Sequence, residues 1–196
     1  MKGILLGCVV VIIGVVLVLG VAVAGSYNRL VTLDEGVKSA WGQVENVYQR
    51  RADLVPNLVE TVKGAAAFEK DTFTAVTEAR AKVGQVNFGK VPDAQGMQKF
   101  QSAQDGLSSA LSRLLVVVEK YPDLKATQNF RDLQAQLEGT ENRIAVERKR
   151  FNDAAQAFNT TRRRFPTVVV ASLFGFAEKP YFQAAAGSDK APQVKF

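Results

Sequence analysis

The chain has 196 residues, of which 47% are hydrophobic, and its 25 basic and 19 acidic side chains give a formal net charge of +6. It contains no histidine, which removes the commonest general acid or base, the usual transition-metal ligand and the simplest pH switch. The only cysteine, Cys8, leaves no partner for an intrachain disulfide or a cysteine–histidine zinc site. Once an apolar N-terminus and a C-terminal tail are set aside, about 140 residues remain, enough for one domain with one core.

Residues 4–24 form an uncharged, apolar run of 21 residues. A helix of that length rises roughly 30 Å, enough to cross the hydrocarbon core of a bilayer. We predict a transmembrane anchor over residues 1–26, with a span that includes Ile4, Leu5, Leu6, Val16, Leu17 and Ala24. A cleavable signal peptide is the alternative, but the run is longer than a usual signal sequence and only residues 22–24 weakly resemble a cleavage site.

Two features of the span stay open at this stage. Residues 5–8 look like a lipoprotein processing box ending at Cys8, but most of the apolar run follows the cysteine, whereas a signal sequence precedes its cleavage point. The flanking basic residues are nearly balanced, with Lys2 before the span and Arg29 and Lys38 after it. The charge rule therefore does not decide on which side of the membrane the soluble domain lies.

Beyond the span, apolar residues recur at alternating steps of three and four from Leu30 to Val47. This spacing predicts a helix with one stripe facing a bundle. Trp41 and Tyr48 flank the stripe and could form a binding pair. We favour core positions for both, because aromatic residues seven apart on a helix usually pack inward.

The helical pattern meets its first interruption at Pro56. Proline disfavours helical geometry at the residue before it and removes a backbone donor, so we predict a turn or a kink within residues 53–57, with Arg51, Asp53 and Pro56 as hinge residues. The arginines at positions 50 and 51 could bind a partner together with Asp53. We favour a simpler interpretation, in which cations lie near the end of one helix and Asp53 caps the next.

Three more helical stretches follow. The second covers residues 58–83, the third covers 93–121, and the fourth begins at Thr127, a residue suited to an N-cap, and runs about 38 residues to Phe165. We therefore predict an all-α fold, with an N-terminal transmembrane helix followed by an elongated antiparallel four-helix, up-and-down bundle over residues 27–165.

The polar residues of the predicted bundle form no recognisable catalytic motif. Glu45, Asp53 and Glu60 could line its interior like the carboxylates of di-iron proteins, but such sites need Glu-x-x-His pairs. We interpret them as a solvated helix face. The glycines at 84 and 89 lack the Lys-Ser/Thr and the preceding strand of a phosphate-binding loop. We expect no catalytic residues, no metal, no cofactor and no enzymatic activity.

Two basic groups, residues 148–150 and residues 162–164, raise the question of nucleic acid. Both alternate with acidic residues and lack stacking aromatic side chains on a sheet. We therefore do not expect nucleic acid among the partners.

The last part of the chain, residues 166–196, begins with an apolar, aromatic segment and ends in a small, polar tail from Gln183 that we expect to be loosely held. A basic cluster beside such a segment is typical of an interfacial membrane anchor. Our candidate contacts with the membrane surface or a partner are Arg162, Arg163, Arg164, Phe165, Phe174, Phe176, Tyr181 and Phe182.

The place of this segment depends on Pro56. If Pro56 makes a turn, four helices alternate in direction and the segment returns to the bilayer. If Pro56 only kinks one long helix, the segment ends far from the bilayer and must pack on the bundle or on another subunit. We favour the turn.

Five stretches resemble the LemA family of bacterial single-pass membrane proteins. They are YNRLVTLDEGVKSAWGQVENVYQRRADLVPNLVETVKG from residue 27, AVTEARAK from 75, YPDLKA from 121, LEGTENRIAVERKRFNDA from 137 and RRRFPTVVVASLFGFAEKPYF from 162. The resemblance covers nearly the whole chain. It implies an anchor in the bacterial inner membrane, a long antiparallel helical bundle and a role linked to membrane organisation, with no established catalytic residues. The chain departs from the family at Phe68-Glu69, where many members have His-Glu, so no role of that histidine applies here.

We expect a membrane-anchored scaffold or adaptor that contacts lipid and self-associates. A membrane protein is a further candidate partner. Glycines at positions 3, 7, 14 and 20 allow close approach of spans and give weak support to a homo-oligomer. The alternative is a regulatory or sensor subunit of a membrane protease or signalling complex. An enzyme is a third class, which a pocket with convergent buried carboxylates would favour.

Overall fold

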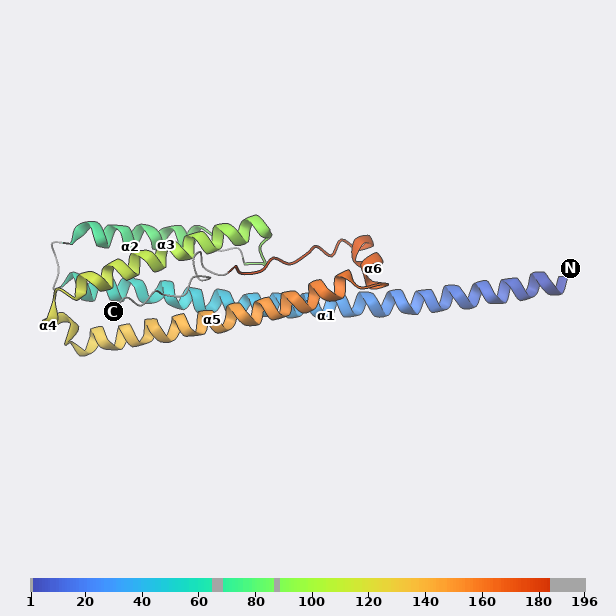
Figure 1. Cartoon of the computed structure of the whole chain (residues 1–196), viewed down its shortest axis with the longest axis horizontal. Coiled ribbons are helices and arrows are strands. Elements are labelled where there is room, and N and C mark those ends of the chain that lie inside the picture. The colour runs from blue at the N-terminus through green and yellow to red at the C-terminus, as the bar shows by residue number, and fades with distance from the viewer. Residues whose placement is uncertain (1, 65–68, 87–88, 184–196) are drawn as a thin grey trace, which may run out of the picture.

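The computed structural model describes residues 2–64, 69–86 and 89–183. Its regular elements are α1 (Lys2–Lys63), α2 (Lys70–Gln85), α3 (Ala94–Val118), the short α4 (Pro122–Lys125), α5 (Gln128–Arg163) and α6 (Thr167–Leu173). Every regular element in these ranges is a helix, which confirms the all-α class. Figure 1 shows α1, α2, α3 and α5 side by side in a long bundle, with α1 continuing alone beyond it. Of the tail predicted from Gln183 onward, Gln183 is described and accepts a hydrogen bond from Arg148, and residues 184–196 lie outside the described residues.

Helix α1 joins a candidate membrane span to the bundle without interruption. It has 62 residues, a length of about 90 Å at 1.5 Å per residue. Its N-terminal half is long and apolar enough to cross a membrane, and the side chains described there, from Val10 to Val23, are exposed. From Leu30 onward most large apolar side chains of α1 pack into the bundle instead, with Val31 as an exposed exception.

The predicted turn at residues 53–57 is wrong, because α1 continues through Pro56 to Lys63. A proline at this position leaves the carbonyl of Ala52 without its usual donor four residues later. Arg80 of α2 supplies the missing hydrogen bond, since its Nε donates to the Ala52 carbonyl at 2.9 Å. Pro56 itself is exposed, and its neighbour Val55 is buried. Packing and the donor from α2 therefore outweigh the helix-breaking tendency of the proline.

The chain reverses after Lys63 instead, and α2 returns along α1. Gly89, just beyond α2, donates from its backbone to the Glu45 carboxylate at 3.1 Å, whereas Arg80 contacts α1 seven residues further on, as antiparallel packing requires. The bundle thus has the predicted number of helices and the predicted alternation of direction. Its first reversal lies later in the sequence than we predicted.

The later helices begin at capping residues. Asp93 caps α3 by accepting a hydrogen bond from the Gly96 amide at 2.7 Å, and Thr127 caps α5 by accepting one from the Phe130 amide at 3.4 Å. The predicted cap at Thr127 is confirmed. Helix α5 packs along α1 over most of its length, while α2 packs mainly on α3.

Two apolar clusters fill the bundle. The cluster far from the span, called the distal core here, includes Val55, Leu58, Val62, Phe73, Val76, Leu107, Leu111, Leu114 and Phe130. The cluster near the span, called the proximal core, includes Leu30, Val37, Trp41, Val44, Tyr48, Phe100, Phe151, Phe158 and Phe182. The core positions predicted for Trp41 and Tyr48 are confirmed, because both side chains are buried.

The compensation of Pro56 by Arg80 predicts non-additive substitutions. Arg80→Met should lower the free energy of unfolding by about 1–2 kcal/mol in the natural chain, because the Ala52 carbonyl loses its donor. In a Pro56→Ala background the same change should have a smaller effect, because a backbone N–H at position 56 then bonds to Ala52. Chemical denaturation of the full-length protein in detergent micelles measures both.

Lys82→Met, an exposed change on the same helix, is the matched control and should behave identically in both backgrounds. Equal effects of Arg80→Met with and without Pro56 would contradict the compensation.

Candidate functional site

Arg51 lies between the two apolar cores. Its side chain is 2% exposed. Its guanidinium donates to Ser108 Oγ at 2.9 Å and to Glu141 Oε1 at 2.7 Å. It also donates to the side chain of Gln104 and to the Gln104 carbonyl at 3.3 Å, and it lies 5.1 Å from the centre of the Tyr48 ring. One cation on α1 therefore connects α3 to α5.

We predicted that Arg51 lies near the end of a helix, but it lies inside α1, which continues to Lys63. The sequence does carry a signal for it, because Arg51 is in register with the buried stripe, seven residues after Val44 and four before Val55. Asp53 is exposed and accepts a hydrogen bond from Gln49 at 2.8 Å, so it does not cap a new helix. Both terminal nitrogens of the Arg51 guanidinium donate hydrogen bonds, whereas its buried Nε has no partner in the described structure. Fixed partners on two other helices suit a structural role.

Arg51→Ala should lower the free energy of unfolding by about 3–5 kcal/mol, because it leaves buried polar partners and a cavity. Arg51→Met combined with Gln104→Leu should recover most of that loss, because apolar side chains then join the two cores. Chemical denaturation in detergent checks both variants. A loss below about 1 kcal/mol for the alanine variant would contradict a central role for this buried charge.

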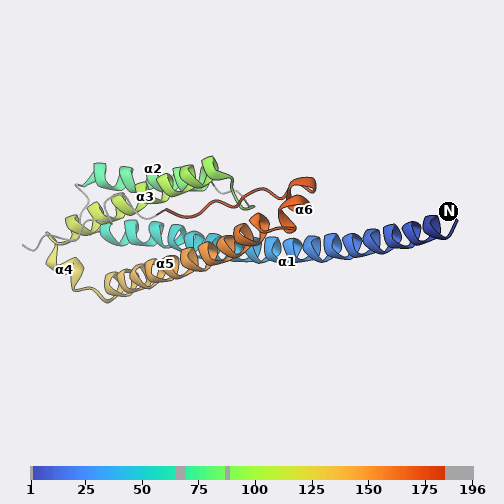
Figure 2. The same cartoon turned by 45° about the vertical axis from the view of Figure 1, so that its right-hand side comes forward.

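After α6 and a turn at residues 174–175, the chain runs back along α5 as an extended segment, residues 176–183, which we call the C-terminal strap (Figure 2). Two asparagine side chains of α5 hold it. Asn159 accepts from the Lys179 amide at 2.9 Å and donates to the Lys179 carbonyl at 2.8 Å. Asn152 pairs in the same way with Phe182, at 2.9 and 3.1 Å. Each amide satisfies both backbone groups of one strap residue, which fixes an otherwise unpaired extended segment.

The strap ends in the proximal core. Phe182 is 6% exposed, and its ring stacks on Trp41 with centres 6.1 Å apart. Arg148 lies 4.9 Å from the centre of the Phe182 ring and donates to the Gln183 carbonyl at 2.7 Å. The strap is therefore a part of the bundle, although its sequence lies beyond the four predicted helices.

The structure divides the predicted contact residues into two groups. Arg162 donates to the Phe176 carbonyl at 2.6 Å and Arg163 pairs with Glu178 at 2.5 Å, so these two arginines hold the strap. Phe182 belongs to the core, Phe176 is half-buried, and the Tyr181 hydroxyl accepts from Asn159 at 3.0 Å. Arg164, Phe165 and Phe174 face outward.

An ion pair fastens the strap to α1. Lys179 lies 2.5 Å from one carboxylate oxygen of Asp34, and Lys38 lies 2.9 Å from the other. Burial by itself would raise the pKa of Asp34, but the hydrogen bonds from Lys179 and Lys38 outweigh it and hold this pKa below its ordinary value. The ionised carboxylate thus contributes stability above the pKa that Asp34 has in the unfolded chain.

That contribution should disappear in acid, as the pH falls through the lowered folded-state pKa of Asp34. Asp34→Asn should therefore be less stable than the natural chain near neutral pH. The difference should shrink toward zero as the pH falls below about 4. Denaturation curves recorded from pH 3 to pH 7 test this, with Asp71→Asn, an exposed residue of α2, as the control for loss of a charge. A difference that does not change with pH would contradict the ion pair's role.

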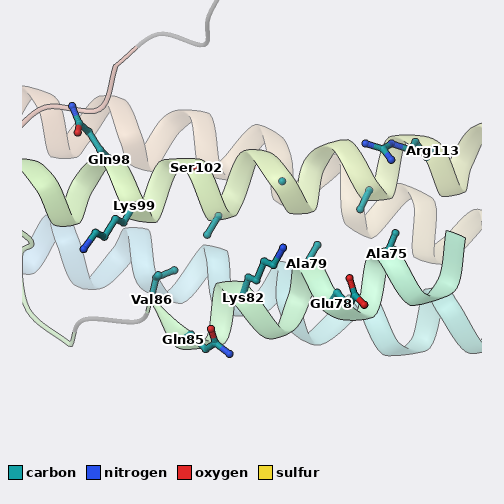
Figure 3. Close-up of a pocket in the computed structure, with 13 residues that line it drawn as sticks. Ala75, Glu78, Ala79, Lys82, Gln85, Val86, Gln98, Lys99, Ser102 and Arg113 are labelled. Atoms are coloured by element: carbon teal, nitrogen blue, oxygen red, sulfur yellow. The ribbon is translucent and has the colours of Figure 1, made fainter. Parts of the chain in front are cut away.

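A shallow groove of about 750 Å³ lies between α2 and α3 (Figure 3). Small residues such as Ala79, Ala103 and Gly106 are among those that line it, and Lys99 and Arg113 lie at its two ends. Within the described ranges no three histidine, cysteine or carboxylate side chains gather as a metal ion would require.

The remaining polar residues singled out from the sequence have local partners or face solvent. Asp53 and Glu60 are exposed, and Glu45 caps the Gly89 amide, so the three carboxylates do not converge. In the basic group of α5, Lys149 pairs with Asp153 at 2.7 Å and Arg150 with Glu147 at 2.8 Å.

The sequence of this bundle and strap matches a known family. The model of the LemA family covers residues 40–196, four fifths of the chain. The chain belongs to the LemA family. The matched range takes in α1 from Ala40 onward, the helices α2 to α6, the Arg51 contacts and the C-terminal strap.

Characterised relatives of this LemA-family chain differ in name. The magnetosome proteins MamQ 1 and MamQ 2 of Paramagnetospirillum magneticum are each 29% identical to it, over 83% of this chain and 66% of the relative. Protein LemA of Metamycoplasma hominis is 23% identical, over 82% of this chain and 70% of the relative. The chain thus spans about two thirds of the length of its MamQ relatives.

Proposed function

We propose that this chain is a scaffold or adaptor anchored in the bacterial inner membrane by a single span, self-associating and linked to the organisation of the membrane. The observation that carries this proposal is the continuity of α1. Because one helix forms both the candidate span and a core element of the bundle, the bundle is a rod mounted on the membrane without a flexible linker. Such a rod holds whatever binds it at a set height and orientation.

The polar groups support a structural role over a catalytic one. The chain has no histidine, and its most buried charged side chain, Arg51, has its hydrogen bonds within the bundle. Two relatives are named for a cellular structure, the magnetosome, and not for a reaction. We therefore propose that this chain acts without a cofactor and without enzymatic activity of its own.

Self-association through the span is supported by one face of α1. Gly7, Gly14 and Gly25 follow one another at spacings of seven and eleven residues, which return to the same side of a helix. Apart from the neighbouring backbone of α1 itself, no atom lies within 4 Å of where a side chain would begin at any of the three, and the same holds at Gly20, so a second helix can approach this face. Small residues let the backbones of two spans approach closely. Gly20, six residues after Gly14, falls on a different side.

The mass of the full-length protein in a mild detergent, measured by light scattering after size exclusion, tests the proposal. We expect a discrete oligomer. Gly14→Leu should weaken association about tenfold, equivalent to about 1.4 kcal/mol, because a bulky side chain separates the spans. Gly20→Leu is the matched control and should leave the mass unchanged. A monomer at every concentration, or equal effects of the two substitutions, would overturn self-association through this face.

The second candidate function is that of a regulatory subunit bound to another membrane protein. The α2–α3 groove favours it, because its small lining residues and the basic side chains Lys82, Lys99 and Arg113 fit a partner helix that carries acidic residues. A monomeric mass together with stable co-purification of one membrane protein in detergent would place this function ahead of the scaffold.

A further inference from the structure

Helix α6 lies beside α1 at the point where the candidate span ends. The ring of Phe174, which follows α6, is 4.9 Å from the ring of Tyr27 on α1, and the ring of Phe176 is 5.8 Å from it. Tyr27 comes three residues after Ala24, the end of the uncharged apolar run, a rise of about 4.5 Å along the helix. Figures 1 and 2 both show α6 where α1 leaves the bundle and continues alone.

Only one side of α6 is used by the bundle. Thr167, Val170 and Ala171 are buried, and the latter two belong to the proximal core. The rest of the helix surface and the residues at its two ends carry five large exposed apolar residues, which we call the α6 apolar face: Leu173 at 76% exposure, Val169 at 59% and Val168 at 42% on α6 itself, with Phe165 at 84% before it and Phe174 at 52% after it. Such clustering is uncommon on a surface that faces water, where exposed apolar residues are usually scattered.

Elsewhere in the described bundle, large exposed apolar side chains do not form such a cluster. Away from the span and α6, the large exposed apolar side chains include Val116 on α3 and Val146 on α5, which stand apart from each other. The α6 apolar face is thus a local property of the end next to the span.

Its surroundings match a membrane interface. Tyr27 is an aromatic residue of the kind found at headgroup level. Arg164 is exposed in the turn before α6, and Arg29 is exposed on α1 two residues after Tyr27. Basic side chains beside apolar and aromatic ones are the pattern by which short segments lie in the boundary between headgroups and acyl chains.

Three contacts fix α6 at this height. Arg162 donates to the backbone of Phe176, Asn159 holds the backbone of Lys179, and the Lys179 ammonium binds Asp34 of α1. Because α1 is continuous, a bilayer that surrounds the apolar run reaches the α6 apolar face without any rearrangement of the chain. This continuity favours lipid over a second protein as the occupant.

We propose that the α6 apolar face is a second membrane contact, seated in the interfacial layer of the same bilayer that the N-terminal span crosses. This inference rests on the proposed membrane anchoring and deepens it. The bundle is then held at two points, the span and α6, and cannot rotate freely about the axis of α1. The partner is the lipid surface itself, with the apolar side chains among the upper acyl chains and Arg164 and Arg29 at the phosphates.

Spin labels on the full-length protein in liposomes of phosphatidylcholine and phosphatidylglycerol test this. In a Cys8→Ser background, single cysteines carry a nitroxide at Leu173→Cys, at Val169→Cys on the same side of α6, or at Val116→Cys as the matched exposed control far from the span. Val16→Cys reports on the span. Accessibility to oxygen, which concentrates in lipid, is compared with accessibility to a water-soluble nickel chelate.

We expect the ratio of oxygen to nickel accessibility at 173 and 169 to be severalfold higher than at 116 and to approach that at 16. Nickel accessibility at 173 equal to that at 116 would overturn the proposal. Low accessibility to both reagents at 173 and 169 would also overturn it, because the face would then be covered by protein. A lipid value at 16 with an aqueous value at 173 refutes only the second contact, whereas an aqueous value at 16 refutes the anchoring as well.

Discussion

The arrangement of the whole molecule depends on one helix, α1, whose two halves are built for different surroundings. Helix α1 exposes apolar side chains along its first half and buries a stripe of them along its second half. Because no break separates the halves, every element that packs on α1 takes a defined position relative to the span. Helix α5 packs along it, and α6 lies at the end of the bundle from which α1 continues alone. The continuity of α1 is therefore what turns a helical bundle into an oriented one.

That continuity depends on help from elsewhere in the chain. Pro56 removes one backbone donor from α1, and Arg80 of α2 replaces it at the Ala52 carbonyl. Helix α2 thus packs against α1 and also supplies the hydrogen bond that α1 lacks at Pro56.

The buried Arg51 gives the bundle a register. The apolar clusters on either side of it would tolerate some sliding of one helix past another, because apolar contacts are not directional. The guanidinium must meet Gln104 and Ser108 on α3 and Glu141 on α5 at the same time, and only one alignment of the three helices allows that. Buried polar groups are known to specify register in helical assemblies in this way.

The C-terminal strap fixes the positions of α5, α6 and α1 at the end of the bundle next to the span. It has no regular structure of its own, and Asn152 and Asn159 replace the neighbouring backbone that a strand would have had. The arginines at 162 and 163, which we predicted to contact the membrane surface or a partner, bind the strap and so hold α6 against α1. These contacts hold in place a segment that has no regular secondary structure of its own.

The sequence alone determined the features that depend on local patterns. The all-α class, the apolar run, the N-cap at Thr127 and the inward positions of Trp41 and Tyr48 follow from spacing and from the chemistry of single residues. We predicted that residues 162–176 return to the end of the bundle next to the span, and they do. The prediction rested on a turn at Pro56, however, and the chain does not turn there.

Only the tertiary structure decided where α1 ends, what Arg51 does and how the strap is held. In each case the deciding partner is distant in sequence: Arg80 lies 28 residues from Ala52, and Glu141 lies 90 residues from Arg51. The preference of a proline for ending a helix, at about 3 kcal/mol, is small enough for such contacts and for core packing to override. Local propensities set the kinds of elements, and long-range hydrogen bonds and packing set their limits.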